Sequence, residues 1–116
     1  MSIERKKTSA RMSQIVVHGD TVYLAGQVAV DAAGGPAAEQ IKNILERIDG
    51  LLAEAGTDKT KLLSATIWLA DIRDFDAINE VWDAWVPDGH GPARACVEAK
   101  LAFTKYIVEV GIVAAR

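Results

Sequence analysis

Two segments of this chain carry side chains whose types and spacing suggest chemistry, "GPARACVEA" at residues 91–99 and "YIVEVGIVA" at residues 106–114. Both are rich in small and β-branched residues, as strands are, and residues two apart in a strand share a face. Arg94 and Cys96 are therefore predicted to share one face of the first strand. Glu109 is the only charged residue of the second segment. The permanent cation of Arg94 and the carboxylate of Glu109 are therefore the first candidates for chemistry.

If these two strands pair as a symmetric hairpin about residues 101–102, Arg94 faces Glu109 and Glu98 faces Lys105. An arginine offers a planar two-pronged donor to a ligand carboxylate, and a nearby glutamate can orient or activate a water. The same pair can also be a structural ion pair across the sheet, or one at a subunit contact. The pattern alone leaves both interpretations open.

The histidines and the cysteine support fewer hypotheses. His18 falls in a predicted turn and His90 in a Gly/Pro-rich loop. Two dispersed histidines do not have the ligand spacing of a zinc site, so we expect no metal site. Cys96 is interpreted first as a small buried hydrophobe, although Arg94 on the same face can lower a thiol pKa.

The composition indicates one globular domain over residues 1–116, with an N-terminal arm at residues 1–12. The net charge of −3 argues against a nucleic-acid partner, because phosphate binding requires clustered positive charge. A solvated arm explains the basic cluster at residues 4–11. The chain has no apolar run for a membrane span or signal peptide, and its one cysteine cannot form an internal disulfide. We therefore expect a cytoplasmic protein without membrane contact.

The first apolar stretch, residues 13–31, predicts a β-hairpin because "HGD" at residues 18–20 interrupts it as a turn does. Alternation divides the second strand of this hairpin into two faces, one with Val22, Leu24 and Gly26 and the other with Tyr23 and Ala25.

Two helices are predicted from apolar residues three and four apart. The first stripe consists of Ile41, Ile44, Leu45, Ile48, Leu51, Leu52 and Ala55, and Gly56 suits its C-terminal cap. The second consists of Phe75, Ile78, Val81, Trp82 and Trp85, with Asp74 as its N-cap. Residues 62–71 lie between them and predict a strand, and Trp68, Trp82 and Trp85 are expected in the core.

The predicted order is two or three strands, a helix, a strand, a helix and two final strands near residues 94–101 and 106–114. This order indicates an α+β fold, a mixed sheet with both helices on one face. The uncovered face then needs a partner, and at this size a homo-oligomer is the simplest solution.

Four segments in order carry a family resemblance: "AGQVAVD", "LLSATIWLADIRDFDAINEVWDAW", "GPARACVEA" and "YIVEVGIVA". Together they resemble the RidA (YjgF-like) family of reactive-intermediate imine and enamine deaminases, from about Ser13 to Ala114. The most specific feature is the Arg of "PARACVEA", followed fifteen residues later by the Glu of "VEV". The second-helix sequence is most similar to the small YoaB-like branch of that family.

The resemblance implies a chorismate-mutase-like, RidA-like sandwich. It also implies a homotrimer, with three sheets around a central barrel and a ligand cleft at each subunit interface. The implied reaction is hydrolysis of small 2-imino acids, or their enamine tautomers, to 2-oxo acids and ammonia, with no cofactor. The alternative function is a non-catalytic trimer that holds small carboxylates in the same cleft. A chaperone-like role would rest only on apolar helix faces, which core packing explains.

By position, the resemblance assigns Arg94 to carboxylate binding and Glu109 to holding the attacking water. It places Cys96, Gly26 and Ala25 beside them, lining the substrate pocket.

The chain also departs from the family pattern. Well-studied deaminases of the family carry a Tyr in the N-terminal segment and a Ser just before "GQ", where this chain has residues 12–13 and Ala25. Gly111 stands where a second acidic residue is usual. Arg11, at the edge of the same region, is interpreted either as part of a solvated arm or as a replacement for some of this polarity.

Overall fold

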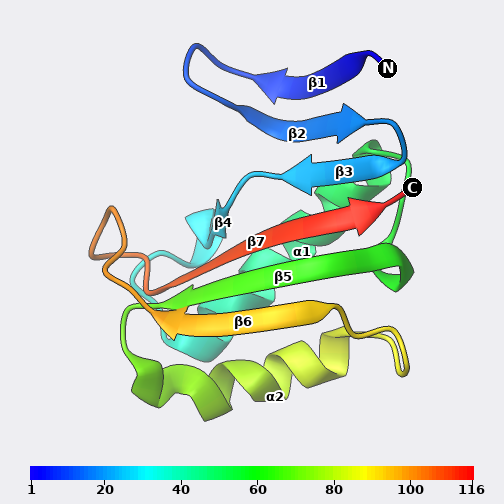
Figure 1. Ribbon diagram of the computed structural model, residues 1–116. Coiled ribbons are helices and arrows are strands. Elements are labelled where there is room, and N and C mark those ends of the chain that lie inside the picture. Colours follow the sequence, from blue (N-terminus) through cyan, green and yellow to red (C-terminus); the bar gives the residue numbers. More distant parts are fainter.

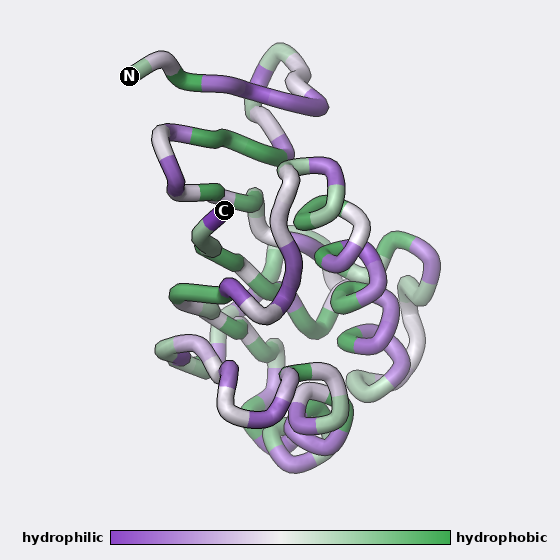
Figure 2. The backbone as a smooth tube through the Cα atoms, turned by 90° about the vertical axis from the view of Figure 1, so that its right-hand side faces the viewer, coloured by the Kyte–Doolittle hydropathy of each residue, from purple (hydrophilic) through white to green (hydrophobic).

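Seven strands form one mixed sheet, and both long helices lie on the same side of it in the computed structural model of residues 1–116 (Figures 1 and 2). The predicted α+β class, a mixed sheet with two helices on one face, is confirmed. The strands are β1 (Ile3–Thr8), β2 (Ser13–His18), β3 (Thr21–Leu24), β4 (Gln27–Val28), β5 (Leu62–Leu69), β6 (Ala93–Glu98) and β7 (Val108–Ala115). The helices are α1 (Ala37–Glu54) and α2 (Phe75–Trp85).

The first three strands are consecutive antiparallel neighbours. Gly19 in the turn between β2 and β3 has a φ of 61°, a left-handed conformation that glycine adopts without strain, and the predicted hairpin is confirmed. The predicted N-terminal arm, residues 1–12, contains β1, which pairs along β2 and stays exposed at nearly every position. Its hydrophilic stretch, purple in Figure 2, suits an edge strand because charged side chains discourage pairing with other sheets.

The strand β7 lies between β3 and β5 and is antiparallel to both. β6 pairs only with β5, in parallel, so the chain crosses over through α2 to connect them. The predicted hairpin of β6 and β7 is therefore wrong, because β5 separates these two strands (Figure 1). A period-two pattern tells which residues share a face, but it does not tell which strand lies alongside.

The helix α1 buries the predicted apolar stripe against the sheet. It ends as predicted at Gly56, whose φ is 82°. The N–H of Thr57 donates to the carbonyl of Leu52, and the N–H of Gly56 donates to the carbonyl of Ala53. These two bonds form a Schellman cap, which satisfies carbonyls that the helix end would otherwise leave without donors.

The helix α2 follows a short 3-10 turn at Ile72–Asp74. The predicted N-cap, Asp74, makes no side-chain capping bond, so that prediction is wrong. Asp71 acts one turn earlier and accepts from the N–H of Arg73 at 2.9 Å. The cap moves because the 3-10 turn runs directly into the α-helix, and the first free N–H groups are those of the turn.

The helices cover one face of the sheet, and no element of the chain covers the other, which is called the open face below. The helix face of β7 is buried at Val108, Val110, Ile112 and Ala114. On the open face Trp68 is only half-buried, so its expected place in the core is wrong, whereas Trp82 of α2 is buried as expected. Neither helix combines the length and apolar composition needed to cross a bilayer.

Candidate functional site

Arg94 of β6 points to the helix face of the sheet, toward α2. It pairs in the sheet with the buried Ala65 of β5, so both side chains leave the same face. Its Nη1 donates to Oδ1 of Asn79 at 2.8 Å. Its Cζ lies 5.4 Å from the ring centroid of Trp82 and 5.8 Å from that of Phe75, which is within cation–π range. Three side chains of α2 thus position this guanidinium.

Arg94 forms no ion pair within 4.0 Å, and one of its five N–H groups is used by Asn79. The structural Arg–Glu pair that the sequence left open is therefore absent within one chain. The remaining N–H groups keep the capacity for a two-pronged bond to a carboxylate.

Glu109 leaves the opposite face of the sheet from Arg94. It pairs with Trp68 of β5 and with Val28 of β4, both half-buried residues of the open face. The expected contact of Arg94 with Glu109 is therefore wrong within a single chain. The strand β5 lies between the strands of Arg94 and Glu109. Its residue Ala65 pairs with Arg94 and its residue Trp68 pairs with Glu109, and side chains of these two β5 residues point to opposite faces because they are an odd number of positions apart.

The expected contact of Glu98 with Lys105 is wrong for the same reason. Glu98 instead accepts from the N–H of Ile72 at 3.1 Å, at the start of the turn before α2. Lys105 lies over the rings of Tyr106 and Phe103.

Cys96 shares the helix face with Arg94, as predicted from the spacing, and is half-buried. Burial raises the pKa of the Cys96 thiol, and the nearby charge of Arg94 lowers it by less. The balance keeps the thiol protonated at neutral pH, so Cys96 is a poor nucleophile here.

On the open face of the sheet, the carboxyl group of Glu109 has a raised pKa. Burial raises the pKa of Glu109, because a low-dielectric environment disfavours the charged form. No hydrogen bond or ion pair of the chain engages its carboxylate, which leaves its lone pairs for a water or ligand. A partly desolvated carboxylate of this kind is suited to accept a proton from water.

Gly26 lies directly against this carboxylate. A β-carbon built on Gly26 would overlap Oε2 of Glu109 and lie 3.0 Å from its Cδ. The predicted alternation fails at Gly26: β3 ends at Leu24, and the irregular residues that follow turn Gly26 toward the open face. Ala25 beside it donates its N–H to the carbonyl of Gln14 and accepts from Nε2 of Gln27.

Gly26→Ala is expected to displace the Glu109 carboxylate by about 1 Å, a shift that costs a reacting group about 10- to 100-fold in rate wherever it takes part in a reaction. Stability should change little, since the overlapping atoms are the flexible end of a side chain. A crystal structure of the variant measures the displacement of the carboxylate, and thermal melts measure the stability.

The matched control is Gly50→Ala on the exposed side of α1, where an added β-carbon meets nothing within 4 Å. It should raise stability by roughly 0.5 to 1 kcal/mol and leave the Glu109 carboxylate where it is. A Glu109 carboxylate that keeps its position in Gly26→Ala would contradict the close approach of these two residues.

A cavity of about 190 Å³ opens beside Glu109 and Gly26. Its other walls are Val28 of β4, Tyr106 and residues 101–103 of the loop before β7. Nothing in the sequence marked this loop as part of a site; its aromatic residues in an exposed segment were the available signal.

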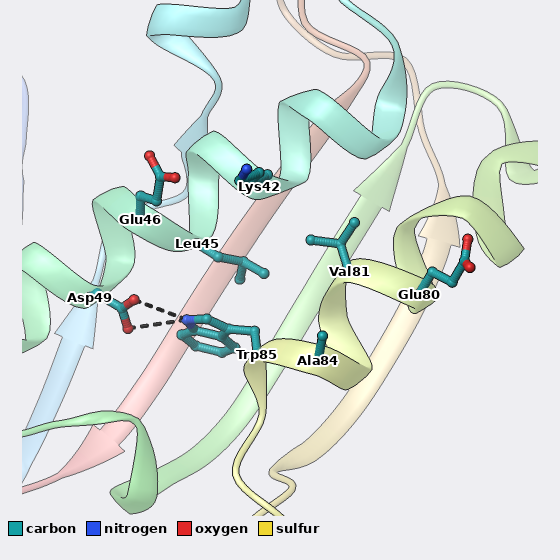
Figure 3. A pocket seen from close by; sticks show the side chains of 8 residues that line it. All are labelled: Lys42, Leu45, Glu46, Asp49, Glu80, Val81, Ala84 and Trp85. Atoms are coloured by element: carbon teal, nitrogen blue, oxygen red, sulfur yellow. Dashed lines mark hydrogen bonds between the residues drawn. The ribbon is translucent and has the colours of Figure 1, made fainter.

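A larger cavity, about 520 Å³, lies in the groove between α1 and α2 (Figure 3). Figure 3 shows Leu45 and Val81 pointing into the groove, while Nε1 of Trp85 donates to both oxygens of Asp49 at 3.1 Å. None of the predicted site residues lines it. Size alone does not make it the reacting site, because its carboxylate at Asp49 is already engaged and its other charged groups are exposed.

The structure also accounts for one departure from the family pattern. A β-carbon at Gly111 would lie 3.3 Å from two ring atoms of Trp68, so a larger residue would have to displace that indole. Gly111 therefore provides space for Trp68 on the open face. Arg11 is exposed in the tight turn between β1 and β2, and His18 and His90 are exposed as well.

Comparison with known proteins agrees with this architecture. The family model described as "Endoribonuclease L-PSP" matches residues 2–116. The chain is 45% identical over 115 residues to the RutC family protein YoaB of Escherichia coli (strain K12), with 99% of each chain covered. It is 35% identical over 91 residues to the 2-iminobutanoate/2-iminopropanoate deaminase of Rattus norvegicus, covering 74% of this chain and 66% of that protein.

Solved structures give the same result for the fold. A YjgF family member from Neisseria meningitidis has a TM-score of 0.96 at 44% identity, covering 100% of this chain and 96% of that one. An uncharacterized protein from Pseudomonas aeruginosa has a TM-score of 0.95 at 43% identity, covering 99% of each chain. The match over almost the whole length confirms the predicted YjgF-like membership, and this chain belongs to the endoribonuclease L-PSP family, which includes the YjgF and RutC proteins.

Proposed function

We propose that this protein hydrolyses small 2-imino acids, or their enamine tautomers, to 2-oxo acids and ammonia, in a cleft between two copies of the chain. The observation that carries the proposal is a pair of free groups: the guanidinium of Arg94, positioned by α2 without an acidic partner, and the unpaired carboxylate of Glu109 with a raised pKa. A relative that is 35% identical bears the name of such a deaminase.

The opposite placement of these two groups supports a site made by two subunits. Arg94 lies on the edge strand β6 and Glu109 on the other face of the sheet, so one small substrate meets both only if they come from different copies. Exposed or half-buried apolar side chains of the open face support an oligomer, namely Tyr23, Trp68, Val97 and Val113. We propose a homotrimer that covers this face.

The mechanism follows from the two groups. Arg94 binds the carboxylate that every 2-imino acid carries, with two parallel N–H···O bonds that fix its orientation. Glu109 accepts a proton from a water, whose oxygen adds to the electrophilic imine carbon. Glu109 returns this proton to the nitrogen, which gives a neutral carbinolamine. The hydroxyl proton then passes to the nitrogen as the carbon–nitrogen bond breaks, so the carbonyl forms, ammonia leaves and Glu109 is again ionised. One water is consumed, with no oxidation or reduction, so the reaction requires no redox cofactor.

The direct test measures imine consumption. An amino-acid oxidase generates 2-iminopropionate from alanine, and semicarbazide traps the imine that remains after a set time. We expect the protein to shorten the imine lifetime relative to buffer and to boiled protein. Consumption no faster than in buffer, for every amino acid supplied, overturns the deaminase proposal.

The alternative is a trimer that binds small carboxylates without turning them over. The absence of the family's N-terminal Tyr, near residues 12–13, and of its Ser, at Ala25, supports this alternative. Calorimetry with 2-oxobutyrate distinguishes the two, because binding without any imine turnover favours the alternative.

A further inference from the structure

We propose that a third cavity, between the basic strand β1 and α1, binds the phosphate group of a small organic phosphate. The cavity measures about 290 Å³, and its walls are Lys7 of β1, Gln14 of β2, and Arg47, Gly50, Leu51 and Glu54 of α1. It shares no lining residue with the cavity beside Glu109 or with the groove between α1 and α2. The proposal therefore goes beyond imine hydrolysis and does not depend on it.

The guanidinium of Arg47 has no partner within the chain. No hydrogen bond engages it, and no carboxylate lies within 4.0 Å of it. Its Nε is the one buried side-chain nitrogen or oxygen that lacks a hydrogen-bond partner. Buried polar atoms are nearly always bonded, so this exception needs an explanation, and an acceptor from outside the chain supplies one. Phosphate suits a guanidinium because two parallel N–H groups can bond two of its oxygens.

The backbone of β1 turns Lys7 toward the same cavity. Consecutive side chains of a strand point to opposite faces, yet Lys6 and Lys7 both reach Glu54 at the end of α1. Lys7 has a φ of 51°, the only left-handed φ of the chain outside glycine, and such residues are concentrated at functional sites. Its Nζ is 3.9 Å from Oε1 of Glu54, too far for a hydrogen bond, so its N–H groups remain available to a ligand.

Gly50 leaves space on the helix side of the cavity. It lies inside α1 (Ala37–Glu54), where a glycine destabilises the helix relative to an alanine. A β-carbon built on Gly50 would meet nothing within 4 Å, so no packing within the chain requires a glycine here. Since Gly50 lines the cavity, the missing side chain instead leaves room for a ligand between Arg47 and Lys7.

The remaining walls indicate the class of ligand. Oε1 of Gln14 accepts from Gln27 at 2.8 Å, which leaves the amide N–H groups of Gln14 as further donors. Donors thus come from β1, β2 and α1, and a phosphate group offers three strong acceptor oxygens to them. The two cations outweigh the single carboxylate of Glu54, so the lining is positively charged. A phosphate group fills only part of the volume, and Leu51 and the space over Gly50 remain for a small organic group.

The experiment is calorimetry with glycerol 3-phosphate, inorganic phosphate and lactate at constant ionic strength, with chloride as the balancing anion. We expect saturable binding of one glycerol 3-phosphate per chain and weaker binding of inorganic phosphate. Arg47→Gln should weaken binding of glycerol 3-phosphate at least about tenfold, since a hydrogen bond to a charged group contributes at least this much. Lys7→Gly should weaken it similarly and keep the backbone, because glycine adopts a φ of 51° without strain.

Gly50→Leu separates binding from folding. Leucine is a better helix former than glycine, and its β-carbon has free space, so the melting temperature should not fall. The leucine side chain would occupy the cavity and should weaken binding of glycerol 3-phosphate at least as much as Arg47→Gln does. Undiminished binding by this variant overturns the proposal.

Two further variants test where the probe binds. Arg5→Gln changes an exposed arginine of the same strand that does not line the cavity, and it should leave the affinity for glycerol 3-phosphate unchanged. Arg94→Lys weakens the carboxylate site proposed for imine hydrolysis. In this variant glycerol 3-phosphate should still bind as it does to the wild type, and lactate should bind much more weakly than glycerol 3-phosphate.

Several results would overturn the phosphate site and leave imine hydrolysis untouched. They are absence of saturable binding, unchanged affinity in Arg47→Gln, loss of affinity in Arg5→Gln or Arg94→Lys, and equal affinity for lactate and glycerol 3-phosphate in Arg94→Lys. Gel filtration of Arg47→Gln adds a last check. Dissociation of an assembly in this variant would assign the guanidinium to a contact between copies and would also overturn the proposal.

Discussion

Replacement of Arg94 by lysine is expected to lower kcat/KM for a 2-imino acid by about 10²- to 10³-fold. Lysine keeps the positive charge but lacks the planar fork that bonds a carboxylate through two N–H groups, and it cannot stack on Trp82 and Phe75 in the same way. Loss of one hydrogen bond to a charged group together with the weaker stacking costs about 3 to 4 kcal/mol, which corresponds to this range. Imine trapping with semicarbazide at several substrate concentrations measures the effect.

The control for this substitution is Arg73→Lys. Arg73 makes a bidentate ion pair with Asp71 at an exposed turn, with Nη2 2.7 Å from Oδ2. Its replacement should leave kcat/KM within about twofold, since exposed ion pairs contribute little. If Arg94→Lys retains wild-type kcat/KM while both variants melt normally, carboxylate binding by Arg94 is refuted.

Replacement of Glu109 by glutamine is expected to lower kcat by about 10²- to 10⁴-fold, the range for loss of a general base. Glutamine keeps nearly the same shape but cannot take a proton from water. Binding of 2-oxo acids should survive, because Arg94 is unchanged. Glu46→Gln, on the exposed side of α1, is the matched control and should have full activity. A Glu109→Gln protein that still hydrolyses imines at the wild-type rate would assign proton transfer to another group.

The pH profile provides an independent check on Glu109. Burial raises its pKa above the ordinary value of about 4.3, and only the ionised form accepts a proton. We expect kcat/KM to fall on the acid side with an apparent pKa above that of a free glutamate. Glu109→Gln should lack this limb in whatever activity remains, and initial rates in buffers of constant ionic strength would reveal it.

The same group should show a trade-off between stability and function. The raised pKa of Glu109 means that the folded state holds this proton more tightly than the unfolded chain. Between the unfolded and the folded pKa, the stability contributed by Glu109 therefore falls as pH rises, and the desolvation penalty is fully present above the folded pKa. At pH 7.5 the Glu109→Gln protein should melt at the same temperature as the wild type or higher, whereas a lower Tm would argue against this environment for the carboxylate.

Much of the local structure could be predicted from the sequence because it depends on neighbours in the chain. The apolar stripe of α1 and the glycine that ends it lie within a few turns of one another, and both are found as expected. The hairpin at Gly19 and the shared face of Arg94 and Cys96 follow from the same local periodicities. The family segments also identified the two residues on which the proposed chemistry rests.

Only the tertiary structure decided how these residues are placed relative to one another. The alternation of β6 and β7 is the same whether they pair directly or with β5 between them, because periodicity contains no information about neighbouring strands. Insertion of β5 sends Arg94 to the helix face and Glu109 to the open face. The irregular residues after Leu24 turn Gly26 toward Glu109, against the alternation of β3. The amino-acid sequence by itself thus determined which groups are available for chemistry, whereas long-range strand pairing determined that a single chain presents them on opposite sides of its sheet.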